Sequence, residues 1–143
     1  MIEWSELNSL MLSETKVVVS SLSQWTGLVV TAGVTLFLAF DGLTKILQVT
    51  PVVRATEKLG LPPYSTVPIG VVLLVCTALY ALPKTAVIGA LLLTAYLGGA
   101  VAIHVSAQSG AFPILFSIAF GALVWTGLAL RNPALGVCLT LRQ

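Results

Sequence analysis

Four long apolar runs, separated by short polar turns, limit most strongly what this chain can fold into. They cover residues 25–47, 66–82, 85–106 and 112–130. A helix that crosses the apolar core of a bilayer needs about 20 mainly apolar residues. Charged residues make up 8% of the 143 residues and hydrophobic residues 57%, whereas a soluble domain carries about 25% charged residues. The sequence therefore predicts an all-α integral membrane protein, a four-helix bundle with up-down topology.

The segments next to these runs also carry helical patterns. Residues 1–24 separate apolar from polar side chains, which predicts an amphipathic N-terminal helix in the membrane interface; a partly ordered leader is the alternative. In residues 50–61, Thr50 can cap a helix, Pro51 suits its first turn and Gly60 suits the position after its end. We therefore expect a short helix in the loop between spans one and two, with a solvated connector as the alternative. The predicted organisation is an N-terminal segment (1–24), one transmembrane domain (25–131) and a short tail (132–143).

An acidic and a basic residue stand near the end of the first apolar run. Asp41 and Lys45 are four residues apart, so on a helix they share one face, with the acid first, which is the favourable order. A bare charge at bilayer depth costs roughly 2.5–3.5 kcal/mol. Asp41 therefore needs a partner, which is either Lys45 or His104, the single histidine. Such a pair can lock the packing of the helices, or it can form the polar end of a pocket.

The up-down topology would gather polar side chains at one end of the bundle, where the first and third runs both end. Asp41 and His104 are the catalytic hypothesis, because histidine titrates near neutral pH and suits acid–base chemistry. The candidate ligand-binding residues around them are Lys45, Gln48, Glu57, Tyr64, Tyr96 and Gln108. This polar end suits the head group of a quinone held non-covalently, of a lipid or of another apolar substrate. The sequence has no metal-ligand spacing, phosphate loop or nucleophile motif.

Basic residues indicate the orientation in the membrane by a narrow margin. Four lie on the side of the termini (Lys16, Lys84, Arg131, Arg142) and three on the other side (Lys45, Arg54, Lys58). The positive-inside rule therefore predicts cytoplasmic termini. The net charge of +2 and the lack of a basic cluster give no indication of nucleic-acid binding.

Several short motifs follow one another in a characteristic order. They are Asp41-Gly42-x-x-Lys45, the hexapeptide 57–62 (EKLGLP), Ile69-Gly70, Leu82-Pro83-Lys84-Thr85, Gly89-Ala90, the segment 96–104 (YLGGAVAIH) and Trp125-x-Gly127-Leu128-x-Leu130-Arg131. Together, over residues 27–131, they resemble the DoxX-like family of small bacterial membrane proteins. The resemblance implies four transmembrane helices in the bacterial cytoplasmic membrane. The wider group is associated with quinone-linked sulfur oxidation, redox-stress complexes and, in animal relatives, receptor assembly.

One departure from the family pattern argues against anion binding next to His104, and one missing motif argues against thiol–disulfide exchange. The family often carries a basic residue soon after the histidine, but here residues 105–108 (VSAQ) have none, and the chain has no CxxC motif for thiol–disulfide exchange. Three classes of function then remain. We favour a redox-partner or accessory subunit that binds a small quinone- or lipid-like molecule. The alternatives are a membrane enzyme that uses Asp41 and His104, and an assembly or scaffold protein. The expected partners are membrane lipids and either a membrane protein or a second copy of the chain.

Overall fold

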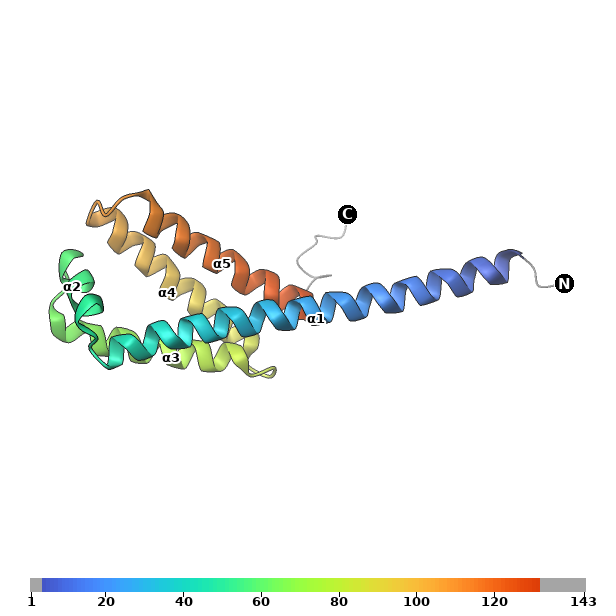
Figure 1. The fold of residues 1–143 in the computed structure, drawn as a ribbon, viewed down its shortest axis with the longest axis horizontal. Coiled ribbons are helices and arrows are strands. Elements are labelled where there is room, and N and C mark those ends of the chain that lie inside the picture. The colour runs from blue at the N-terminus through green and yellow to red at the C-terminus, as the bar shows by residue number, and fades with distance from the viewer. Residues whose placement is uncertain (1–3, 132–143) are drawn as a thin grey trace.

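The computed structural model describes the backbone of residues 4–131 and the side chains of residues 22–131. The described chain is helical (Figure 1). Its elements are α1 (Trp4–Ile46), α2 (Thr50–Lys58), the 3₁₀ turn η1 (Pro63–Ser65), α3 (Thr66–Ala81), α4 (Ala86–Ser106) and α5 (Ala111–Arg131). The predicted tail, residues 132–143, lies outside the described residues.

Four of these helical segments are long and apolar enough to cross a membrane. They are Leu22–Ile46, Pro63–Ala81, Ala86–Ser106 and Ala111–Arg131. The prediction of an all-α protein with four membrane-length helices is therefore confirmed. Most ends agree to within a residue, and the first and second segments each begin three residues earlier than expected. Proline is tolerated in the first turn of a helix, so Pro63 does not prevent η1 from leading directly into α3.

Helix α1 differs from the sequence prediction at its N-terminal end. The predicted boundary after residue 24 is not a break, because α1 continues through it from Trp4 to Ile46. The chain has no glycine or proline between residues 4 and 26, so nothing local ends the helix where the composition changes. Figure 1 shows this part of α1 extending past the other helices. The predicted amphipathic faces involve side chains outside the described residues.

The short helix α2 is present as predicted, but its first turn differs by one residue. Thr50 is the first helical residue rather than the cap, and the capping position belongs to Val49. The carbonyl oxygen of Val49 accepts hydrogen bonds from the backbone N–H groups of Val52 and Val53, at 2.8 and 3.1 Å. Gly60 follows the helix with a φ of +79°, a conformation that glycine adopts without strain.

The membrane-length helices pack as a ring around an apolar core. Helix α1 contacts α3 and α5, and α4 contacts the same two helices. The most deeply buried side chains include Leu73, Tyr80, Leu93, Val124 and Leu128. A close approach of α1 and α3 holds the polar part of α1 in place: a Cβ atom on Gly70 would lie 2.8 Å from the carbonyl oxygen of Gly42. Small residues allow such backbone contacts between membrane helices.

Tyr80 joins α3 to α5 at the end of the bundle away from α2. Its side chain is fully buried, and its hydroxyl donates a hydrogen bond of 2.9 Å to the Val124 carbonyl of α5. The Arg131 guanidinium donates to the Tyr80 carbonyl at 2.8 Å and lies 5.2 Å from the centre of the Tyr80 ring. The last turn of α3 is thereby fixed to α5.

We expect Tyr80→Phe to lower the free energy of unfolding by about 1 kcal/mol, because it removes one buried hydrogen bond and keeps the ring. Thermal unfolding in detergent measures this as a lower melting temperature. Tyr64→Phe is the matched control, since the Tyr64 side chain is 77% exposed and should tolerate the loss of its hydroxyl. Equal melting temperatures for the two variants would show that the Tyr80 hydroxyl does not stabilise the bundle.

Candidate functional site

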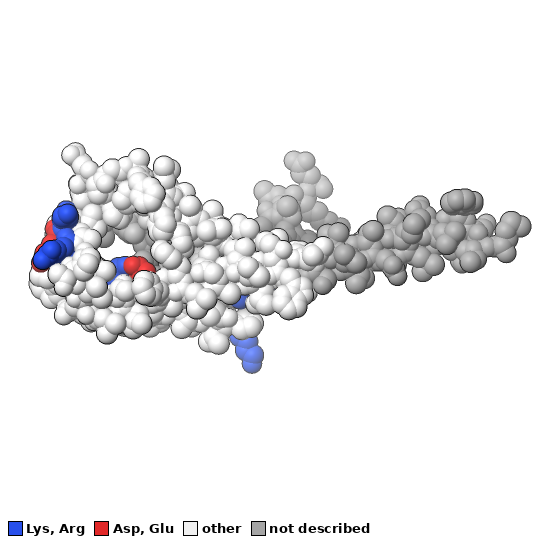
Figure 2. Space-filling view, viewed as in Figure 1, with Lys and Arg blue, Asp and Glu red and all other residues white. Residues whose placement is uncertain are grey.

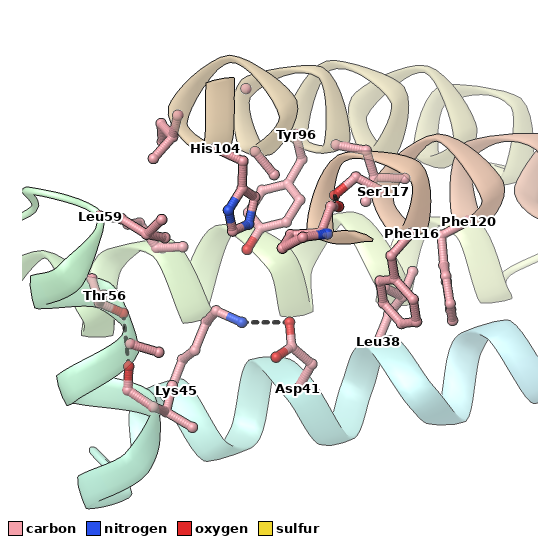
Figure 3. A pocket seen from close by; sticks show the side chains of 18 of the residues that line it. Leu38, Asp41, Lys45, Thr56, Leu59, Tyr96, His104, Phe116, Ser117 and Phe120 are labelled. Carbon is pink, nitrogen blue, oxygen red and sulfur yellow. Dashed lines mark hydrogen bonds and ion pairs between the residues drawn. The ribbon is translucent and has the colours of Figure 1, made fainter. Parts of the chain in front are cut away.

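A cavity of about 700 Å³ lies at the α2 end of the bundle. Its walls come from α1, α2, α4 and α5 (Figure 3), and Ile69 of α3 also lines it. Most of the lining side chains are apolar. Binding sites for small molecules are typically about 300–1,000 Å³ and combine apolar walls with a few placed polar groups. The cavity has the size and composition of such a site.

Six polar side chains line this cavity: Thr56 of α2, Ser117 of α5 and four from α1 and α4. Asp41 and Lys45 come from α1, and Tyr96 and His104 from α4. In Figure 3, Tyr96 and His104 point from α4 toward Asp41 and Lys45 on the opposite wall. The structure thus brings together the two residues of the catalytic hypothesis and two of the candidate ligand-binding residues.

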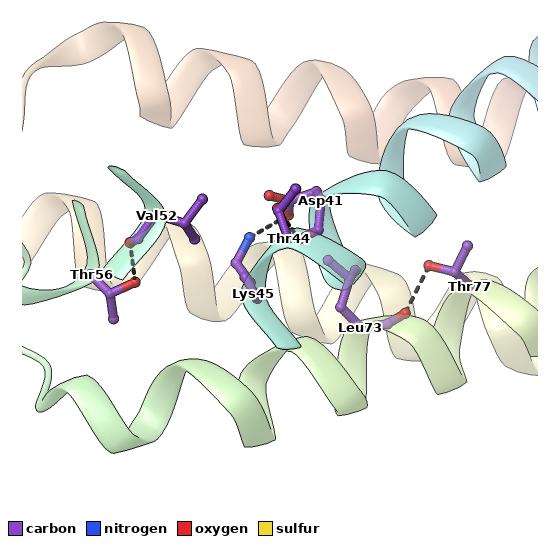
Figure 4. Close-up of polar contacts among 7 residues, drawn as sticks. All are labelled: Asp41, Thr44, Lys45, Val52, Thr56, Leu73 and Thr77. Carbon is purple, nitrogen blue, oxygen red and sulfur yellow. Dashed lines mark hydrogen bonds and ion pairs between the residues drawn. The ribbon is translucent and has the colours of Figure 1, made fainter. Parts of the chain in front are cut away.

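The partner of Asp41 is Lys45. The Lys45 ammonium donates a hydrogen bond to the Asp41 carboxylate, and the two form an ion pair within one turn of α1 (Figures 3 and 4). The His104 ring instead has its Nδ1 atom 2.8 Å from the Ser109 hydroxyl. Of the two partners that the sequence allowed for Asp41, the structure therefore selects the nearer one on its own helix.

The other candidate residues lie at the same end of the bundle but do not line the cavity. In the part of the chain that the structure describes, Gln48, Glu57, Tyr64 and Gln108 are all exposed. Gln48 and Gln108 follow the last turns of α1 and α4, each with a φ of +49°, and the chain turns there before either side chain reaches the cavity. Glu57 lies on the outer face of α2, opposite the face that lines the cavity.

A cluster of four phenylalanine side chains beside the cavity was not predicted from the sequence. Phe37 of α1 meets Phe116 and Phe120 of α5, with ring centres 5.7 and 4.7 Å apart. Phe112 adds a further ring 6.0 Å from Phe116, and all four line the cavity. The available signal was the four-residue spacing of Phe112, Phe116 and Phe120, which puts them on one helix face.

The cavity opens through the side of the bundle. Figure 1 shows α1 separating from α4 and α5 toward the α2 end, and Figure 2 shows a hollow there with acidic and basic atoms inside it. Asp41 and Lys45 are the acidic and basic residues that line it. Since these helices cross the membrane, an opening in their side faces the lipid.

Helix α2 covers the end of the same cavity. Its apolar residues Val52 and Ala55 line the cavity, together with Leu59 directly after its last residue. Arg54, Glu57 and Lys58 are exposed, and charged side chains gather at this end of the molecule in Figure 2. Helix α2 therefore turns its apolar face to the end of the cavity and its charged face outward.

Removing one partner of the Asp41–Lys45 ion pair should lower the stability of the fold more than removing both partners. We expect Lys45→Met to lower the melting temperature, because Asp41 would keep a partly buried charge without its partner. The double variant Asp41→Leu/Lys45→Met removes both charges and should recover most of that loss. Thermal unfolding of the two variants and of the unmodified protein in one detergent tests this. A double variant that is as unstable as Lys45→Met would contradict it.

Four apolar membrane-length helices around a lateral cavity define a small multi-pass integral membrane protein. The model of the DoxX-like family matches residues 29–127. This match includes every residue that lines the cavity. The chain belongs to the DoxX-like family, as the order of its motifs predicted. No match was found among curated proteins or among solved structures.

Proposed function

We propose that this protein binds a small hydrophobic molecule with a polar head, of quinone or lipid type, in the cavity beside Asp41 and His104. The carrying observation is a cavity of about 700 Å³ with mostly apolar walls and six polar side chains, four of which lie on the facing helices α1 and α4. The lateral opening would admit the molecule from the bilayer. Its apolar part would lie against the phenylalanines of α1 and α5.

The charges at the cavity favour a head group without net charge. Asp41 and Lys45 neutralise each other, so the wall offers hydrogen bonds rather than a net field. An ammonium group has three donors, and the Lys45 ammonium uses one on Asp41. The Tyr96 hydroxyl and the His104 ring add two further polar groups. The absence of a basic residue in 105–108 fits the same conclusion. A small polar head without net charge, of quinone or lipid type, meets these requirements.

The geometry supports binding better than acid–base catalysis by Asp41 and His104. The Asp41 carboxylate is held by Lys45, and one nitrogen of His104 faces Ser109. We therefore propose the role of an accessory or redox-partner subunit, in which a bound molecule is held for a partner protein. Turnover of an apolar substrate by the purified protein alone would favour the enzyme alternative.

Mass spectrometry of a lipid extract tests the proposal. The protein is purified in a mild detergent, extracted with organic solvent and compared with an unrelated membrane protein purified from the same cells. We expect one small apolar molecule with a neutral polar head to be enriched at close to one molecule per chain. An extract that contains the same bulk lipids, in the same proportions, as the comparison protein would refute the proposal.

We further propose an up-down topology in the bacterial cytoplasmic membrane with both termini in the cytoplasm. The support is the excess of one basic residue on the side of the termini. A reporter fused after the last residue should be active in the form that works in the cytoplasm. Activity of a reporter that works only outside the cytoplasm would reverse the orientation.

A further inference from the structure

The turn after α4 determines which nitrogen of His104 carries the proton. The turn brings Ser109 back over the last turn of α4, where the Ser109 backbone N–H donates to the His104 carbonyl oxygen at 3.1 Å. The Ser109 hydroxyl lies 3.1 Å from the same carbonyl oxygen and 2.8 Å from His104 Nδ1. A hydroxyl has one hydrogen, and a carbonyl oxygen can only accept.

These two contacts are satisfied together in one arrangement. The hydroxyl donates to the carbonyl oxygen, and Nδ1–H of the imidazole donates to the hydroxyl oxygen. In the neutral ring the other nitrogen, Nε2, is then without a hydrogen and acts as an acceptor, because the hydrogen bond of one ring nitrogen sets the state of the other. His104 lines the cavity, and Figure 3 shows its ring directed from α4 into it.

The opposite wall offers the complementary group. The Lys45 ammonium lies across the cavity from His104 in Figure 3 and is donor-only. A head group between His104 and Lys45 therefore meets an acceptor on one side and a donor on the other. A hydroxyl group bonded to an apolar body satisfies both, since it donates to one neighbour and accepts from another.

We propose that the molecule held in this cavity is a hydroxylated amphiphile whose hydroxyl donates to Nε2 of His104, with Ser109 as the residue that positions the ring. This inference rests on the proposed function and specifies its ligand class, a phenol- or alcohol-type head on an apolar tail. The reduced, hydroxyl-bearing form of a quinone belongs to this class, whereas a head that only accepts hydrogen bonds does not.

Two probes that differ in one hydrogen-bond donor test the ligand class. 4-Decylphenol carries a hydroxyl, and 4-decylanisole replaces it by a methyl ether of similar shape. We expect the purified protein in detergent to bind the phenol about tenfold more tightly, as one net hydrogen bond allows. The preference should fall below about threefold in Ser109→Ala and vanish in His104→Phe. Ser106→Ala, at an exposed serine of the same helix end, is the control and should keep it.

Nitrogen NMR reports which ring nitrogen of His104 carries the hydrogen. This would not change in a Ser109 variant if Ser109 had only a structural role. The chain contains one histidine, so ¹⁵N-histidine labelling yields a single pair of ring signals. We expect the neutral ring of the unmodified protein to carry its hydrogen on Nδ1. In Ser109→Ala the proportion of the Nε2–H form should rise, and in Ser106→Ala it should not.

The outcomes separate this inference from the proposal on which it rests. An Nδ1–H ring together with a phenol preference that Ser109→Ala reduces supports both. Binding of the two probes with equal affinity, or a ring with its hydrogen on Nε2, overturns the ligand class but leaves the cavity as a binding site. No binding of either probe overturns both.

Discussion

The Gly89→Ala variant is expected to lose about 3 kcal/mol of stability, a large effect for the addition of one methyl group. A Cβ atom at position 89 would lie 2.2 Å from the backbone nitrogen of Tyr80 and 2.4 Å from its Cα atom. Because both are backbone atoms, no side-chain rotation relieves the clash, and the first turn of α4 must separate from the last turn of α3. Overpacking in a core costs about 1–3 kcal/mol and occasionally more.

The clash would also disturb a residue on which other contacts depend. Tyr80 anchors α5 through its hydroxyl and receives the Arg131 side chain, so moving its backbone weakens the contacts of α3 with α4 and with α5 together. Thermal unfolding in detergent, or the yield of monodisperse protein at size exclusion, measures the loss.

Gly98→Ala on the same helix is the matched control, and its effect should have the opposite sign. A Cβ atom at position 98 meets nothing within 4 Å, and replacing glycine by alanine inside a helix gains roughly 0.5–1 kcal/mol. Similar losses in Gly89→Ala and Gly98→Ala would show that the α3–α4 contact is not as close as described.

The second large expected effect is a loss of the bound molecule from the cavity. Gly99→Phe should abolish retention of the bound molecule while the protein remains folded. Gly99 lines the cavity, and nothing lies within 4 Å of a Cβ atom built on it, so a large side chain enters the cavity without displacing the backbone. A benzyl group there would compete with the ligand for the space between α4 and α1. The amount of the enriched molecule per chain, from the lipid extract, is expected to fall at least tenfold.

The control variant Gly98→Phe introduces the same side chain at the neighbouring position, outside the cavity. Gly98 is exposed and does not line the cavity, so this variant should retain the ligand. Loss of the ligand in both variants, or in neither, would contradict binding in the cavity. A loss of a co-purifying membrane protein in Gly98→Phe, with the ligand retained, would instead favour the scaffold alternative, because the outer face of α4 would then be an interface.

Local sequence patterns predicted most of the helices, because the length of an apolar run and the residues at its ends determine where a helix forms and ends. Apolar length predicted the four spans, and the four-residue spacing of Asp41 and Lys45 predicted their pairing as one of two possibilities. Gly60 predicted the end of α2. The continuity of α1 past residue 24 was not predicted, because the change of composition there was interpreted as the boundary between two separate segments.

Which residues line the cavity could not be predicted from local sequence patterns, because it depends on how the helices end and pack against one another. Tyr96 and His104 line the cavity and Gln108 does not, since α4 ends before it and the chain turns. Phe37 meets the phenylalanines of α5 only because α1 and α5 are neighbours in the ring of helices. The role of Ser109 depends on a turn whose geometry the sequence does not indicate.

The most direct test of the central claim is an experimental structure of the protein extracted from its own membrane without added ligand. We expect ordered, non-protein density between α1 and α4, with its polar end within hydrogen-bond distance of Lys45 and His104 and its apolar end against the phenylalanines of α5. A structure in which side chains fill this space, and in which Asp41 and His104 point to opposite sides of the bundle with no molecule between them, would contradict the claim.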